Sequence, residues 1–186
     1  MKHLFFILTI SLLVFASCGE KKVPQPQREG IQWGEIRFGT LDEFGDTEDA
    51  TLHFTYANGK TDSLPFTLLY DMSPENFELI GGGRIEEQDI NFDGIPDLQI
   101  CLGAFDGYGN LTYEGFVWDR EKGGFVNVPN YFEIFNPQVY NDSICGFYRE
   151  WLEGIEYQTG TTYQWIDGNL VMTREWSDEF DPYAEE

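Results

Sequence analysis

The sequence predicts an all-β domain, in which antiparallel hairpins form either a sandwich or a propeller-like assembly. Short segments of alternating polarity recur along the chain, glycine-rich turns separate them, and aromatic residues make up 17% of the composition. Alternating polarity indicates half-buried strands, and aromatic side chains fill the interior between sheets. Short strands at regular intervals with such turns are typical of sandwiches, barrels and propellers.

The expected strands occur largely as hairpins. Residues 51–56 alternate in polarity, Asn58 and Gly59 form a turn, and residues 61–68 are the return strand. An Asn-Gly pair accepts the positive φ angles of a tight hairpin turn. Pro65 has no amide hydrogen, which places its strand at a sheet edge. Further strands are expected at residues 84–90, 98–102, 111–118, 125–128, 155–166 and 170–176.

Helical structure is expected at one place only. Ser73 can cap a short helical turn, and Pro74 suits its first position because the amide that Pro lacks has no partner there. The acidic residues 177–186 are expected to fray.

The N-terminus has the pattern of a lipoprotein signal. Residues 4–16 form an apolar run that is shorter than the roughly 20 residues of a membrane-spanning helix. The segment Phe15-Ala16-Ser17-Cys18 resembles a bacterial lipobox, in which Cys18 carries the lipid, although the pattern usually has Leu where this chain has Phe15. An ordinary signal peptide with a chance cysteine is the alternative.

These features divide the chain into three parts. Residues 1–17 are the expected signal peptide, residues 18–30 a lipidated cysteine with a flexible tether, and residues 31–186 a single β-rich domain. The residues after Cys18 do not resemble a strong acidic signal for surface export. We therefore expect an envelope lipoprotein on the periplasmic side of the outer membrane.

The charge limits the classes of partner. The formal net charge is −22, a sign that disfavours nucleic-acid binding because affinity for phosphate comes mainly from Lys and Arg. Such a surface maintains solubility, steers basic partners or collects divalent cations.

The sequence gives little support for catalysis. His53 is the only histidine left after removal of the signal peptide, so sites that need a second histidine lack their partner. We therefore expect no enzyme. Cys101 and Cys145 are compatible with a disulfide in an oxidising compartment, but the sequence does not show that they meet.

An acidic segment interrupts the predicted strands at residues 88–98. Positions 1, 3, 5, 6 and 9 of an EF-hand-type calcium loop are matched by Asp89, Asn91, Asp93, Gly94 and Asp97. Calcium takes six to eight oxygen ligands, and converging carboxylates without a cation would repel one another. The segment therefore predicts a Ca²⁺ site, with a metal-free turn rich in Asp and Asn as the alternative.

The predicted loop departs from the EF-hand at its closing position. Ile100 stands where an EF-hand has a bidentate Glu, so we expect Asp97 to close the site instead. The carbonyl of Ile95 is the expected backbone ligand. Flanking strands in place of helices favour a structural role for the ion over a sensor role.

The loop and its surroundings resemble a family of bacterial envelope proteins. The shared pattern is D-x-N-F-D-G-x-x-D-L, a glycine-rich stretch, an aromatic hairpin and a closing Y-x-W/Y-x-D-G-x-L segment, here at residues 89–98, 103–110, 113–125 and 163–170. The resemblance implies an immunity-type protein that inhibits peptidoglycan hydrolases, including effectors delivered by type IV secretion. It also implies a fold similar to invertebrate-type lysozyme inhibitors.

The resemblance further implies where a partner would bind. Such inhibitors insert an S-G-x-Y loop into the hydrolase cleft, and this chain has Cys145-Gly146-Phe147-Tyr148 followed by Arg149. Gly146, Tyr148 and Arg149 are therefore the candidate partner-binding loop, facing a basic lysozyme-like enzyme. The alternative function is glycan binding, with rings such as Trp118, Tyr108 and Trp151 as stacking platforms.

Overall fold

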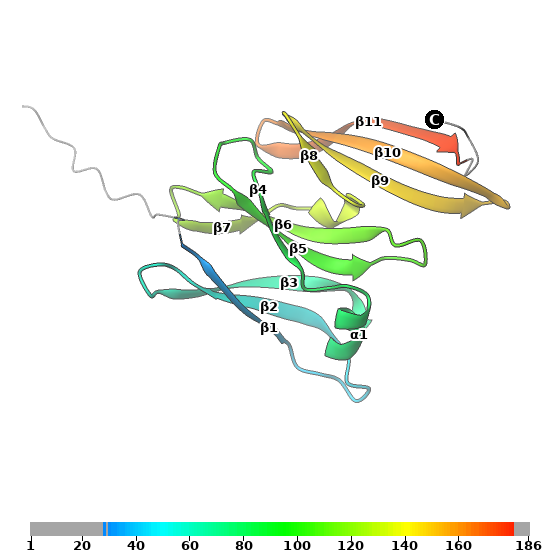
Figure 1. Ribbon diagram of the computed structural model, residues 1–186. Helices are drawn as coiled ribbons and strands as arrows, with labels where there is room; N and C mark the ends of the chain where they lie inside the picture. The colour runs from blue at the N-terminus through cyan, green and yellow to red at the C-terminus, as the bar shows by residue number, and fades with distance from the viewer. Residues whose placement is uncertain (1–27, 29, 181–186) are drawn as a thin grey trace, which may run out of the picture.

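The computed structural model describes residues 28 and 30–180, which form three antiparallel sheets (Figure 1). The first sheet contains β1 (Gln32–Phe38), β2 (Thr47–Thr55) and β3 (Thr61–Met72). The middle sheet contains β4 (Ile85–Gln88), β5 (Asp97–Ala104), β6 (Leu111–Asp119) and β7 (Gly124–Asn127). The third sheet contains β8 (Gln138–Tyr140), β9 (Ser143–Leu152), β10 (Ile155–Ile166) and β11 (Asn169–Glu179).

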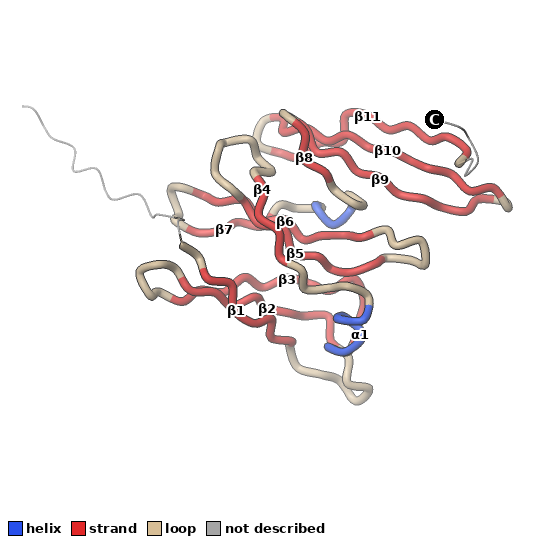
Figure 2. Tube along the Cα trace, viewed as in Figure 1, coloured by secondary structure: helices blue, strands red, loops and turns tan. Residues whose placement is uncertain are grey.

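Each sheet is a meander, because every strand pairs with its neighbour in the chain. Strands dominate the trace in Figure 2, and the helical segments of the described chain are α1 (Pro74–Leu79) and the 3₁₀ turn η1 (Tyr131–Glu133). The all-β class expected from the sequence is confirmed.

The middle sheet is buried on both faces. On one face, Leu98, Ile100 and Leu102 of β5 pack in a core with apolar residues of β2 and β3. On the other face, Cys101 and Tyr113 pack in a second core with Ile144 of β9 and with partly buried residues of β10. The three sheets are therefore layers of a sandwich, as Figure 1 shows. The propeller-like arrangement that the sequence left open is not confirmed.

The predicted strands are present, and most of them extend beyond the predicted limits, whereas β4 is shorter than the predicted 84–90 and β10 has the predicted bounds. Pro65 lies in β3, an edge strand of the first sheet, as its missing amide requires. Asp167 and Gly168 join β10 to β11 with φ angles of 50° and 79°, as a tight hairpin turn demands. At α1, the Ser73 side chain accepts a hydrogen bond from the amide of Asn76, and Pro74 begins the helix.

Three strands were not predicted from the sequence. β1 has a register shift between Trp33 and Ile36, which breaks its side-chain alternation, and β9 contains the adjacent charged residues Arg149 and Glu150. β8 has three residues, too few for a periodic pattern. These strands form because pairing with a long neighbour satisfies their backbone groups.

Arg28, which lies in the expected tether, packs against the middle sheet. The Arg28 guanidinium donates to Glu87 Oε2 at 3.1 Å and to the Asp97 carbonyl at 3.2 Å. It also lies over the Phe125 ring, 5.5 Å from the centroid. Arg28 of the expected tether therefore contacts the middle sheet, and the predicted division of the chain into three parts stays a prediction. The predicted signal peptide, residues 1–17, and Cys18 lie outside the described residues.

The fold settles one further question. Cys101 and Cys145 are both free, so the open question of a disulfide is answered in the negative. In the described part of the chain, no helix has the length and apolar character needed to cross a membrane.

We predict that Gly115→Ala destabilises the sandwich. A Cβ at this position would lie 2.5 Å from Cγ of the buried Tyr131 ring, so the ring or β6 would have to move. Overpacking of this kind costs about 1–3 kcal/mol of unfolding free energy, measured by urea denaturation. Gly124→Ala is the matched control, because its Cβ would meet no atom within 4 Å. Equal stability of the two variants would contradict the packing described here.

Candidate functional site

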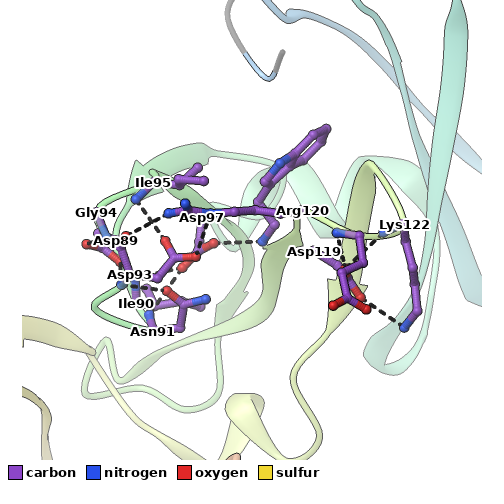
Figure 3. Close-up of polar contacts among 12 residues, drawn as sticks. Asp89, Ile90, Asn91, Asp93, Gly94, Ile95, Asp97, Asp119, Arg120 and Lys122 are labelled. Atoms are coloured by element: carbon purple, nitrogen blue, oxygen red, sulfur yellow. Dashed lines mark hydrogen bonds and ion pairs between the residues drawn. The ribbon is translucent and has the colours of Figure 1, made fainter. Parts of the chain in front are cut away.

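The acidic loop predicted from the sequence joins β4 to β5 (Figure 3). Asp89 accepts hydrogen bonds from the amides of Asp93 and Gly94, at 3.1 and 2.8 Å. Asn91 Oδ1 accepts from Asp93 N at 3.0 Å, and Asp93 Oδ1 accepts from Ile95 N at 2.8 Å. The loop is therefore wound around its own backbone amides, and the predicted residues are brought together.

Asp97 has a different environment from the other loop carboxylates, because it is fully buried. Its Oδ2 accepts from the amides of Ile90 and Asn91 at 3.0 and 3.1 Å, and its Oδ1 accepts from Trp118 N at 2.7 Å. Burial raises the pKa of Asp97 to about 6, while the three amide hydrogen bonds oppose that rise. The carboxylate thus ties the start of the loop to β5 and β6.

Arg120 supplies positive charge to the outer side of the loop. Its guanidinium donates to the Asp93 carbonyl at 2.9 Å, and its Nε lies 3.6 Å from Asp93 Oδ2. Figure 3 shows Arg120 reaching the loop from the turn that follows β6. Part of the carboxylate repulsion in the loop is therefore offset by the protein itself.

The oxygen donors of the loop are of the type that calcium prefers, but Asp97 does not have the freedom expected of a bidentate ligand. Each carboxylate oxygen has two lone pairs. Asp97 Oδ2 already accepts two hydrogen bonds and Oδ1 accepts one, which leaves at most one lone pair for a metal. No group of three or more His, Cys, Asp or Glu side chains in the described chain is arranged to hold a metal ion. Calcium binding stays a prediction.

The segment that was expected to form a partner-binding loop is part of a strand. Gly146, Tyr148 and Arg149 all lie in β9, which is paired with β10 along its length. Gly146 is buried, and a Cβ there would lie 2.5 Å from Thr161 Oγ1 and 2.9 Å from Ile134 Cγ2. The glycine is therefore required by packing and is not available to a partner. Tyr148 and Arg149 are accessible.

Tyr148 and Arg149 line an open groove of about 380 Å³. Its other lining residues come from the β5–β6 turn, the segment before β8, and β9 and β10: Tyr108, Asn110, Asn136, Phe147 and Gln158. Of these, the sequence pointed to Tyr108 and to the glycine-rich stretch that contains Asn110. Nothing in the sequence marks Asn136 or Gln158. Pairing of β9 with β10 brings Gln158 to the groove, and hydrogen bonds to Phe147 and Leu111 hold Asn136 there.

Two asparagines build the floor of the groove. The side chain of Asn110 donates to the Arg149 carbonyl at 2.8 Å and accepts from the Arg149 amide at 3.1 Å. The side chain of Asn136 donates to the Phe147 carbonyl at 2.8 Å, and its oxygen accepts from Leu111 N at 3.1 Å. These amides take the place of a neighbouring strand along the part of β9 that β8 does not reach. They hold the third sheet against the middle sheet.

A row of aromatic rings leads from the first sheet to the groove. Tyr70 of β3 lies 6.1 Å from Phe105, Phe105 lies 5.4 Å from Phe135, and Phe135 lies 5.2 Å from Tyr148, as centroid distances. The Tyr70 hydroxyl also donates to the Phe105 carbonyl at 2.6 Å. Tyr70, Phe105 and Tyr108 are all exposed. One end of the sandwich thus presents an aromatic surface beside the groove.

Arg149 is held in place at the edge of the groove. Its guanidinium lies 3.8 Å from the centroid of the Phe180 ring, and its Nη1 lies 3.8 Å from Glu156 Oε1. A partner that used Arg149 would meet a guanidinium that is already oriented.

Comparison with known proteins finds a solved structure with a similar fold. No protein-family model matches the sequence, and no curated protein matches it. Among solved structures, the chain is similar to a Xanthomonas protein described as related to a type IV secretion system. The identity is 16%, the TM-score is 0.53, and the match covers 87% of this chain and 88% of that chain. At this identity the similarity shows a shared fold.

We predict that Asp97→Asn is strongly destabilising. The amide group has a single acceptor oxygen and would turn an NH₂ group towards backbone donors, so at least one buried amide loses its partner. Since hydrogen bonds to charged groups contribute about 1.5–3 kcal/mol each, we expect a loss of about 3 kcal/mol in chemical denaturation.

The matched control is Asp119→Asn. Asp119 also accepts from two backbone amides, those of Glu121 and Lys122, but in a solvent-accessible turn where water can replace it. Its expected cost is below about 1 kcal/mol. A loss for Asp97→Asn no larger than for this control would refute the buried role of Asp97.

Proposed function

We propose that this protein is a non-catalytic binding protein that inhibits peptidoglycan hydrolases in the cell envelope. In this proposal it is anchored to the membrane through lipid on Cys18 and faces the periplasm. The observation that carries the proposal is the position of Tyr148 and Arg149. Tyr148 was selected by the resemblance to hydrolase inhibitors and Arg149 directly follows that motif, and both line an open groove beside exposed aromatic rings.

The similar solved structure is consistent with a role connected to type IV secretion. The similar Xanthomonas structure is described as related to a type IV secretion system. The sequence resemblance points independently to immunity-type proteins, some of which act against effectors delivered by type IV secretion. The expectation of a hydrolase that attacks the cell wall rests on the sequence resemblance, and the similar fold adds a protein that is linked to type IV secretion.

The negative net charge of the protein favours a basic partner. A formal net charge of −22 gives the protein a strongly negative field, which accelerates encounter with a cationic enzyme and disfavours acidic partners. The groove itself carries the oriented Arg149, which would contact an acidic group within an otherwise basic cleft.

Calcium has a structural part in this proposal. Asp89, Asn91 and Asp93, with the Ile95 carbonyl, would supply its oxygen ligands, and Asp97 would add at most one. The ion would neutralise the loop carboxylates and stiffen the connection between β4 and β5. It would take no part in binding the hydrolase.

We predict that calcium raises the stability of the wild type but not of Asp93→Ala. For an extracellular-type site with a dissociation constant of about 10⁻⁴–10⁻³ M, about 10 mM calcium adds about 1.4–2.7 kcal/mol. Thermal unfolding with and without calcium measures this, and Asp119→Asn should keep the full response because it lies outside the loop. Equal responses of wild type and Asp93→Ala would remove the calcium site from the proposal.

We predict that Arg149→Ala weakens inhibition of a susceptible lysozyme. Arg is enriched among the interface residues whose truncation costs more than about 1 kcal/mol, so we expect a loss of at least about fivefold in the inhibition constant. Inhibition of cell-wall lysis measures the effect. Arg174→Ala in β11 is the control, since Arg174 is exposed and does not line the groove. Absence of inhibition by the wild type against lysozymes of the c, g and i types would refute the proposed function.

Glycan binding is the second candidate. It is favoured by the exposed rings of Tyr70, Phe105 and Tyr108 at one end of the sandwich, because sugar rings stack on such surfaces. Trp118, an expected platform, is only 3% exposed and belongs to the first core, so it cannot stack on a ligand. Retention of the protein on soluble peptidoglycan fragments, lost in Tyr108→Ala, would favour this function over inhibition.

A further inference from the structure

The hairpin that joins β9 to β10 projects past the end of the middle sheet (Figure 1 and Figure 2). Its last paired residues are Leu152 and Ile155, so the turn contains only Glu153 and Gly154. These two residues have φ angles of 52° and 88°. Two consecutive positive φ angles are those of the tight turn that matches the twist of a hairpin. The projecting tip is therefore a defined structure.

The tip exposes apolar side chains. Trp151 is 53% exposed, Leu152 is 50% exposed and Ile155 is 42% exposed. Folding of the hairpin does not require these residue types at a solvent-exposed position. Leu152 and Ile155 are cross-strand partners on one face of the hairpin, and Trp151 lies on the other face, opposite Glu156. An exposed tryptophan is typical of a binding hot spot, where aromatic anchors contribute most of the affinity.

Acidic residues surround these apolar side chains. Glu150 precedes Trp151, Glu153 lies in the turn and Glu156 follows Ile155. The only basic residue in β9 and β10 is Arg149, which already contacts Glu156. The tip is therefore an apolar surface with a net negative rim.

The base of the hairpin is held by Asn110, one of the residues that line the groove. Asn110 binds both backbone groups of Arg149, two residues before Trp151. A partner held by the tip would therefore lie directly beside the groove lined by Tyr148 and Arg149.

We propose that the β9–β10 hairpin tip is the element that inserts into the hydrolase, with Trp151 as its anchor, in an apolar pocket that has a basic rim. This inference rests on the proposed function and replaces the segment at residues 145–148 as the inserting element. The negative rim disfavours insertion into an anionic lipid surface, and the charge of −22 disfavours docking of a second copy.

The test uses the full mature chain with Cys18→Ser, so that no lipid contributes to binding. Trp151→Ala and Glu153→Lys change the tip. Phe44→Ala and Glu43→Lys are matched controls, because these residues form an equally acidic and exposed apolar site in the β1–β2 connection of the first sheet. The probes are purified lysozymes of the c, g and i types and vesicles of phosphatidylethanolamine and phosphatidylglycerol. Binding is measured by biolayer interferometry at low and high salt, and inhibition by the rate of lysis.

For each lysozyme that the wild type binds, Trp151→Ala should weaken the dissociation constant by about 30-fold, as expected for a hot-spot aromatic residue. Glu153→Lys should slow association several-fold, and this effect should shrink at high salt. Both controls should stay within about twofold of the wild type. Unchanged thermal unfolding shows that the variants are folded.

The outcomes separate the two proposals. Inhibition by the wild type that Trp151→Ala leaves intact overturns the tip as the inserting element and leaves the proposed function standing. Binding through Trp151 without inhibition supports the tip and overturns the proposed function. Binding to none of the lysozymes overturns both. Trp151-dependent binding only to vesicles of phosphatidylethanolamine and phosphatidylglycerol assigns the tip to a membrane and overturns its role here.

Discussion

The rest of the structure depends on the burial of the middle sheet on both of its faces. Seven of the eight residues of β5 are buried, and alternate side chains enter different cores. A strand in this position needs a layer on each side, because either face left open would expose apolar side chains to water. The first and third sheets supply those layers. A three-layer sandwich follows from this requirement.

Asp97 is the one charged residue of β5, and its carboxylate organises the connection into that strand. It holds the amide of Ile90 on one side and the amide of Trp118 on the other. The carbonyl of Ile90 in turn accepts a hydrogen bond from Trp165 Nε1 of β10, at 2.7 Å. Both backbone groups of Ile90 are thus satisfied by different sheets. The acidic loop is a joint between the middle and third sheets, whether or not an ion is bound to its outer carboxylates.

At its opposite end, the third sheet is joined to the middle sheet by neutral asparagine side chains. β8 pairs with only the first part of β9, so the next backbone groups of β9 need other partners. The side chains of Asn110 and Asn136 provide them. Because amides occupy less space than another strand, a groove remains beside them, and the β9–β10 hairpin continues beyond it. The exposed aromatic and apolar side chains of this end therefore lie where no further strand covers β9.

The sequence by itself determined the all-β class, most of the hairpins and their turns, because period-two polarity and Asn-Gly or Asp-Gly pairs are local signals. It also located the acidic loop, since the spacing of Asp89, Asn91 and Asp93 is contained within one short segment. Only the tertiary structure decided that Asp97 is buried among three amides, that Gly146 is internal, and that Tyr148 meets Asn136 and Gln158 at a groove. Those relations join residues from different sheets, and no local pattern encodes which sheets will stack.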